Sequence, residues 1–207
     1  MTSRERVINV LNHRPVDRLP REPWFLPGIP MFRRAEMDAL LRDYPSDFAA
    51  PPNVYAPGKR AQGTPSVKGT STDAWGCVFE VQESGVIGEV KHALFADDYR
   101  GLESYEPPWE MIARFDRDAV AAFCAQTDKF VLVGTETRPF ERMQFLRGTE
   151  DLFCDLAEDE PKARVLRDKL HEFYCEEMRL WASTPVDGVG FMDDWGTQRA
   201  LLINPKT

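Results

Sequence analysis

Two short apolar runs that end abruptly in polar residues constrain the fold of this chain more than any other feature. Residues 186–192 read V-D-G-V-G-F-M and stop at Asp193 and Asp194, and residues 130–134 read F-V-L-V-G and stop at T-E-T-R. Such runs predict strands that are buried on both faces of a sheet. In folds that alternate strands and helices, ligands bind at the carboxyl ends of parallel strands. We therefore expect the polar residues that follow both runs to face a site.

Extended and helical segments alternate along the rest of the chain, which predicts a parallel α/β sheet. The expected strands cover residues 18–25, 45–50, 130–134 and 186–192. The expected helices have capping residues or one apolar face, and they start at Thr2, Ala35, Asp116, Thr149 and Pro161. Asn204-Pro205 predicts the start of one more helix.

The segment from about residue 73 to residue 95 departs from this alternation. Large and polar side chains alternate over residues 75–82, a turn is expected at Glu83-Ser84-Gly85, and residues 86–92 return. This pattern predicts a β-hairpin inserted into the main fold. Residues 51–72 hold four prolines and three glycines and predict a long loop.

Composition excludes several classes of function. The 207 residues carry 26 Lys and Arg against 34 Asp and Glu, a net charge of −8 without a basic cluster, which argues against nucleic-acid binding. No stretch approaches the ~20 apolar residues of a membrane span and no secretory leader is evident, so we expect a cytoplasmic protein. The four cysteines form no C-x-x-C pair, and the sequence has no P-loop, G-x-G-x-x-G or G-x-S-x-G motif.

Asp193 and Asp194 are the candidate catalytic residues. Consecutive side chains of an extended strand point to opposite faces, so the two carboxylates are not expected to share a proton. We expect one of them to face the site and the other to brace the following loop or cap a turn.

Six further residues are candidates for substrate binding. Glu136 and Arg138, two positions apart, could orient an anionic or polar substrate or could pair with each other. Trp24 and Trp195 could wall an apolar pocket or pack in the core. The remaining two are Asp47, on the second expected strand, and Gln198, after the last one. No metal ligand is predicted, since His171 and Cys175, at a metal-binding spacing, fall away from the apolar face of their helix.

Several patterns, taken in order, resemble the uroporphyrinogen decarboxylase superfamily, which also holds cobalamin-dependent methyltransferases that act on methylated corrinoid proteins. They are T-S-R-E-R-V-I-N-V-L-N-H-R-P-V-D-R-L-P at 2–20, D-A-W-G at 73–76, P-F-E through F-L-R-G at 139–148, and M-D-D-W-G at 192–196 leading to Asn204-Pro205. The resemblance spans nearly the whole chain. It implies a (βα)8 barrel, of which residues 1–207 would be the amino-terminal half, with about the first four βα units and the hairpin as an insertion.

The resemblance also implies a reaction. True uroporphyrinogen decarboxylases carry an arginine-rich motif after the first strand, where this chain reads W-F-L-P-G-I-P at 24–30. We therefore expect corrinoid-dependent methyl transfer, with uroporphyrinogen III decarboxylation in porphyrin biosynthesis as the alternative. The zinc ligands of such methyltransferases belong to the second half of the barrel, so this chain is expected to hold no cofactor, while the complete protein would use zinc and a corrinoid.

An alternative of another class is a half-barrel that interacts with a partner and has no catalytic role. An open parallel sheet exposes an edge and an apolar face. We therefore expect the chain to be a fragment, or else to pair with a second copy in a homodimer or with a complementary half-barrel. The expected partners in the reaction are a small-molecule substrate or a methylated corrinoid protein.

Overall fold

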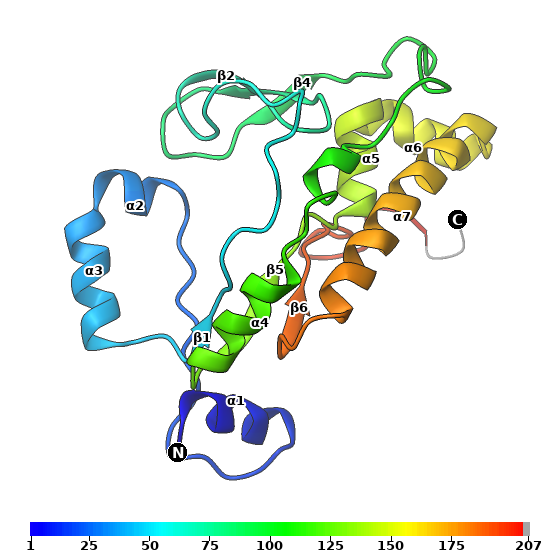
Figure 1. The fold of residues 1–207 in the computed structure, drawn as a ribbon. Coiled ribbons are helices and arrows are strands. Elements are labelled where there is room, and N and C mark those ends of the chain that lie inside the picture. The colour runs from blue at the N-terminus through cyan, green and yellow to red at the C-terminus, as the bar shows by residue number, and fades with distance from the viewer. Residues whose placement is uncertain (205–207) are drawn as a thin grey trace.

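The computed structural model describes residues 1–204, so the expected helix at Asn204-Pro205 lies outside the described residues. Within that range a parallel sheet of three strands lies at the centre of the fold (Figure 1), in the order β1 (Phe48–Ala49), β5 (Phe130–Gly134) and β6 (Gly188–Gly190). Phe48 lies opposite Phe130, and Val133 lies opposite Val189. Because β5 is central, it is the most buried of the three strands, which confirms the prediction for residues 130–134.

The expected (βα)8 pattern with four βα units is wrong. Residues 18–25, predicted as the first strand, pair with no other strand of the described chain. Pro20 and Pro23 have no backbone N–H to donate to a ladder, and the N–H of Arg21 donates instead to the carboxylate of Asp47 at 2.8 Å. The last predicted strand is shorter than expected, because Phe191 and Met192 lie beyond the pairing with β5. It is also not buried on both faces, since Val189, Phe191 and Met192 are exposed.

An antiparallel sheet forms the upper part of the molecule in Figure 1 and contains β2 (Gly69–Thr72), β3 (Val78–Val81) and β4 (Glu89–His92). The predicted hairpin is confirmed by the pairing of β3 with β4. β2 lies inside the segment 51–72 that was expected to be a loop, and it pairs with β3 from Gly69 opposite Val81 to Thr72 opposite Val78.

Each helix that the sequence predicts within the described chain is present. Thr2 and Glu5 form the expected capping box, and Asp116 accepts a hydrogen bond from the N–H of Ala119. Gly148 rather than Thr149 occupies the N-cap of the following helix. The predicted helices are α1 (Ser3–Leu11), α3 (Arg34–Asp43), α4 (Arg117–Gln126), α6 (Thr149–Glu158) and α7 (Pro161–Ala182). Two more α-helices of the described chain were not predicted, namely α2 (Gly28–Phe32), in place of an expected loop, and α5 (Pro139–Arg147).

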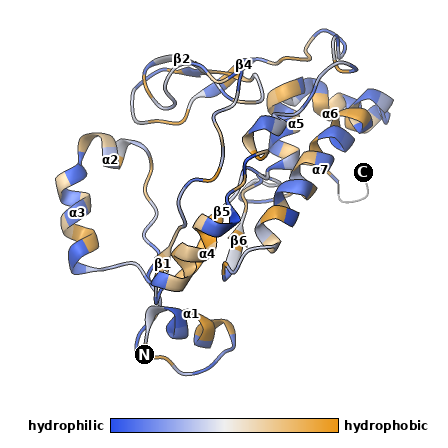
Figure 2. Cartoon of the chain, in the orientation of Figure 1, coloured by the Kyte–Doolittle hydropathy of each residue, from blue (hydrophilic) through white to orange (hydrophobic). Residues whose placement is uncertain are grey.

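Hydrophobic side chains of the antiparallel layer and of α5, α6 and α7 form one core cluster. α7 buries the apolar face that the sequence predicts, and Figure 2 shows apolar and polar residues alternating around α6 and α7. Members of this cluster include Trp75, Phe95, Leu146, Leu166, Leu170 and Phe173. A second cluster joins α4, β5 and α7 through Val54, Val120, Val133 and Trp181. α7 is 22 residues long, and no helix of the described chain has the apolar length of a membrane span.

Helices α2 and α3 form an arm that stands apart from the helical body (Figure 1). In the described chain neither helix contains a buried residue. The arm touches the hairpin turn at Gly28, where Gly85 has a φ of +93° and a Cβ added to it would lie 2.8 Å from the Cα of Gly28. A glycine at position 85 is therefore required both by the left-handed backbone and by the close contact.

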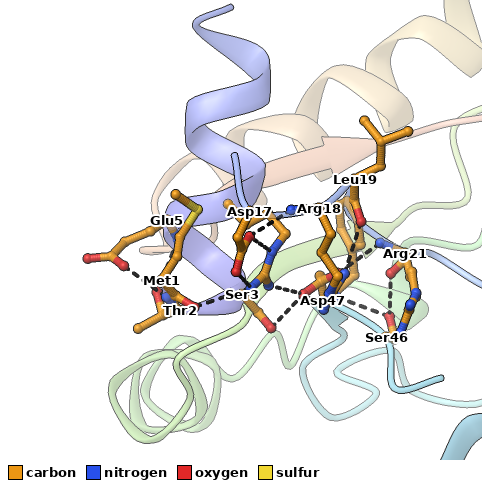
Figure 3. A network of polar contacts seen from close by, with 12 residues as sticks. Met1, Thr2, Ser3, Glu5, Asp17, Arg18, Leu19, Arg21, Ser46 and Asp47 are labelled. Atoms are coloured by element: carbon orange, nitrogen blue, oxygen red, sulfur yellow. Dashed lines mark hydrogen bonds and ion pairs between the residues drawn. The ribbon is translucent and has the colours of Figure 1, made fainter. Parts of the chain in front are cut away.

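Asp47 connects the amino-terminal segment to the sheet (Figure 3). Its buried carboxylate accepts hydrogen bonds from the Ser3 hydroxyl at 2.7 Å, from Arg6 and Arg18 at 2.6 Å each, and from the Arg21 N–H at 2.8 Å. Burial alone would raise the pKa of Asp47, but these hydrogen bonds and the adjacent positive charge hold it well below its ordinary value. Asp47 thus closes a charged network at the amino end of β1.

Candidate functional site

A cleft of about 960 Å³ separates the antiparallel sheet from the carboxyl ends of β5 and β6. One wall comes from β3 and β4, the other from α5 and the first turn of α6, and the loop after β6 reaches its rim. Gly148, with a φ of +97°, turns the chain between the two helices so that α6 starts at the cleft. The sequence predicted polar residues at this edge of the sheet, and the cleft lies there.

Asp193 caps the helix that forms one wall of the cleft. Its carboxylate accepts hydrogen bonds from the backbone N–H groups of Phe140 at 3.0 Å and Glu141 at 2.8 Å. These are two of the N–H groups that the first turn of α5 cannot satisfy internally. The indole N–H of Trp195 donates to the same carboxylate at 2.7 Å. Asp193 therefore braces α5 from the loop after β6.

Asp194 lies at the rim of the same cleft but has a different environment. It is exposed, and its carboxylate accepts one long hydrogen bond, from the N–H of Gly196 at 3.3 Å. Both acids line the cleft, but their environments differ, because Asp193 is occupied by the cap and Asp194 is exposed.

Arg138 and Glu136 both reach the site, but they do not pair with each other. The guanidinium of Arg138 forms an ion pair with Glu141 at 3.1 Å, one turn along α5. Arg138 lines the cleft, and with Glu136 it also lines a smaller adjoining pocket of about 220 Å³. The backbone N–H of Glu136 donates to Glu177 at 2.9 Å, which fixes the loop that carries both residues.

The other four predicted residues lie in different places. Trp24 lines the cleft and is 71% exposed, so it does not pack in the core. Trp195 is also exposed and holds Asp193 rather than lining the cleft. Gln198 lies in the exposed turn closed by Gly196 and Leu201, outside the residues that line the cleft. Asp47 lies at the amino end of β1 with its carboxylate occupied by the network described above.

Sequence reasoning missed three buried charged residues close to the site, namely Arg142, Arg147 and Glu177. Arg142 lies one turn after Arg138 on α5 and forms an ion pair with Asp73. Glu177 interrupts the apolar face of α7, four residues after Phe173, and is fully buried. The position of Glu177 could have been found, because residues four apart share one face of a helix.

Glu177 ties three segments together. Its carboxylate accepts hydrogen bonds from the hydroxyl of Tyr55, from the N–H of Glu136 and from the hydroxyl of Thr137, the last two at 2.9 Å. The indole N–H of Trp181 in turn donates to the Tyr55 hydroxyl at 2.8 Å. Burial raises the pKa of Glu177 above its ordinary value, against the opposing effect of these donors. Glu177 therefore positions the loop after β5 and does not itself reach the cleft.

The surface of the cleft combines apolar and charged groups. Phe79 from β3 and Phe145 from α5 meet edge to face, with ring centroids 5.4 Å apart. Lys91 adds a cation that pairs with Glu89, and Glu150 adds an acid. Sites of this size with an apolar wall and a few polar groups bind small molecules. In the described chain no three His, Cys, Asp or Glu side chains are grouped so as to hold a metal ion.

Comparisons of the chain with protein-family models, with curated proteins and with solved structures gave no match.

Proposed function

We propose that this chain binds a small-molecule substrate in the cleft, and that it serves in corrinoid-dependent methyl transfer as a relative of the uroporphyrinogen decarboxylase superfamily. The observation that supports a substrate site is the convergence of Asp194 and Arg138 on one cleft from the loops after two neighbouring strands. The reaction itself is proposed from the resemblance in sequence. The superfamily's barrel is not part of the proposal.

The proposal gives each polar group a role. Asp194, which is exposed at the rim, would accept a hydrogen bond from the substrate. Arg138 would bind a polar or anionic substituent, while Phe79 and Phe145 contact the apolar part. Asp193 would act indirectly, because it holds the start of the helix that follows Arg138.

Methyl transfer has more support than decarboxylation of a tetrapyrrole. A substrate with eight carboxylates requires many cationic partners. Arg33 and Arg34, the basic residues nearest to the expected arginine-rich motif, are exposed and form ion pairs with Glu36 and Asp38 on the projecting arm. They do not line the cleft.

The residues described here do not fit the zinc ion that the resemblance implies. Cys124, Cys154 and Cys175 are separate, Cys77 is buried beside Arg142, and no group of ligating side chains is present within residues 1–204. We therefore assign no step of the reaction to zinc in this chain.

A methyl-transfer assay tests the proposal. The protein would be incubated with methylcobalamin and a thiol acceptor, with loss of the methyl–cobalt absorbance and formation of the methyl thioether measured together. We expect turnover by the unmodified protein. The Asp193→Asn, Asp194→Asn double variant should be slower by at least about tenfold, because one hydrogen bond to a charged group contributes about 1.5–3 kcal/mol to binding of the reacting substrate. Arg34→Gln, on the arm, is the matched control. Full activity of the double variant would contradict the assigned roles.

A second candidate function, an interaction module without catalysis, is favoured by the surface beside β6. The strand pairs with β5 on one side, and within the described residues no strand covers its other edge. Phe191, Met192 and Trp195 are exposed in the segment that follows the strand. Open edges and exposed apolar patches are typical of surfaces that bind another chain. Light scattering coupled to size exclusion tests the homodimer, and a monomer at every concentration would contradict it.

A further inference from the structure

The smaller pocket beside the cleft has the properties of a distinct binding site. It encloses about 220 Å³ between the antiparallel sheet and the first turn of α5, and it shares Arg138 and Phe79 with the cleft. Ser71 and Thr72 from β2 and Arg142 from α5 are among its lining residues. A substituent of a ligand in the cleft can therefore extend into this side pocket.

The guanidinium of Arg142 is held rigidly at this pocket. The side chain is almost fully buried, its exposed fraction being 4%, and it stacks over the ring of Trp75 with its Cζ 4.9 Å from the ring centroid. Its hydrogen bonds to the Asp73 carboxylate and the Cys77 sulfur both use Nη1. The Nε of this fixed guanidinium is thus a buried donor without a partner in the described chain.

Arg138 repeats the arrangement one turn earlier. Its Nη1 donates to Glu141, and its Nε is buried and also without a partner in the described part of the chain. A buried donor without a partner destabilises a protein unless something else accepts its hydrogen bond. Two such donors, of the same type and at the same pocket, indicate that the pocket normally holds a hydrogen-bond acceptor.

The charges around the pocket limit the nature of that acceptor. The arginines require an acceptor group, and a planar anion matches the guanidinium fork better than a neutral oxygen does. Asp73 and Glu141 each already balance one arginine, and Glu136 adds a further negative charge to the wall. A doubly charged phosphate would therefore be repelled more strongly than a singly charged group.

We propose that the side pocket binds a carboxylate group of the ligand, between Arg138 and Arg142. The inference goes beyond the methyl-transfer proposal and does not depend on it, because it concerns recognition of one substituent and would hold for any reaction in the cleft.

Arginine side-chain NMR tests the inference on the atoms that carry it. The Nε–Hε resonances of the full chain would be followed in ¹H–¹⁵N spectra during titration with propionate, with propionamide as the neutral isostere and with inorganic phosphate. We expect propionate to shift the resonances of Arg138 and Arg142, and we expect Arg138→Gln to weaken binding by about tenfold or more. Arg34→Gln, remote from the pocket, should leave binding unchanged.

Four outcomes would overturn the inference. These are no shift of either resonance with propionate, an equal response to propionamide, tighter binding of phosphate, and unchanged affinity in Arg138→Gln. Arg142→Lys provides a second variant, and circular dichroism establishes whether it is folded. Since the readout needs no turnover, failure of carboxylate binding can be distinguished from failure of the methyl-transfer assay.

Discussion

Replacing Asp193 by alanine should destabilise the protein far more than the same change at Asp194. Asp193→Ala removes the acceptor of the Phe140 and Glu141 N–H groups and leaves the first turn of α5 without its cap. The exposed carboxylate of Asp194 accepts a single hydrogen bond of 3.3 Å. The two substitutions remove the same chemical group from adjacent positions, so each serves as the control for the other.

The magnitude follows from the two parts of the interaction. Loss of a side-chain cap costs about 0.5–2 kcal/mol, and loss of a negative charge at a helix amino terminus costs about 0.3–1 kcal/mol more. We therefore expect Asp193→Ala to lower the free energy of unfolding by about 2 kcal/mol, and Asp194→Ala to change it by less than about 0.5 kcal/mol. For a chain of this length the former corresponds to a fall in Tm of roughly 4–8 °C.

Urea unfolding followed by circular dichroism measures both free energies. The slope of the transition should stay constant, since neither change alters the area exposed on unfolding. Amide hydrogen exchange provides a local readout, because the N–H groups of Phe140 and Glu141 should exchange faster in Asp193→Ala than in Asp194→Ala. Equal losses of stability in the two variants, or unchanged exchange at both amides, would refute the capping role of Asp193.

Three further predictions concern the buried groups. Asp47→Ala should destabilise by about 1.5–3 kcal/mol, because it removes the buried carboxylate that accepts from Arg6 and Arg18, while Arg6 keeps its ion pair with Asp17. Since the folded-state pKa of Asp47 is lowered, its contribution should be present above the ordinary aspartate pKa and be lost as the pH falls, as urea titrations at several pH values would measure. The pKa of Glu177 is raised, so its contribution to the free energy of unfolding should be largest in acid and be lost as the pH rises through the folded-state pKa. Glu177→Gln should abolish this pH dependence of stability. An unchanged dependence in the variant would contradict the prediction. Leu166→Ala, at a fully buried position, should cost about 2–5 kcal/mol in urea unfolding.

The sequence predicts those elements whose signals are local. The unbroken apolar run of β5 and the apolar stripe of α7 require burial in any tertiary fold, so both elements were predicted correctly. β2 was missed because Gly69–Thr72 carries no apolar pattern of its own and becomes a strand through pairing with β3. Residues 18–25 were wrongly predicted as a strand. Their prolines favour an extended backbone but have no N–H groups to donate to a sheet.

The sequence predicted where the cleft lies, but the site itself stays a prediction. Polar residues after β5 and β6 do meet at one cleft, and Asp194 and Arg138 line it. The partner of each side chain was not predictable, because the ion pair of Arg138 with Glu141 and the cap that Asp193 provides depend on where α5 starts relative to β6. Arg142 went unnoticed because a single arginine in a helix is ordinary until its burial is known.

The link between Arg4 and Asp187 has a consequence for how the chain folds as it is synthesised. Arg4 donates to the Asp187 carboxylate at 2.6 Å, across 183 residues of sequence, and the same carboxylate accepts from the N–H of Val131 in the central strand. Ribosomes add about 5–20 residues per second, so roughly 10–40 s separate the synthesis of the two partners. During that interval α1 can already pack against β5, and the ion pair with Asp187 is added only when β6 has been made.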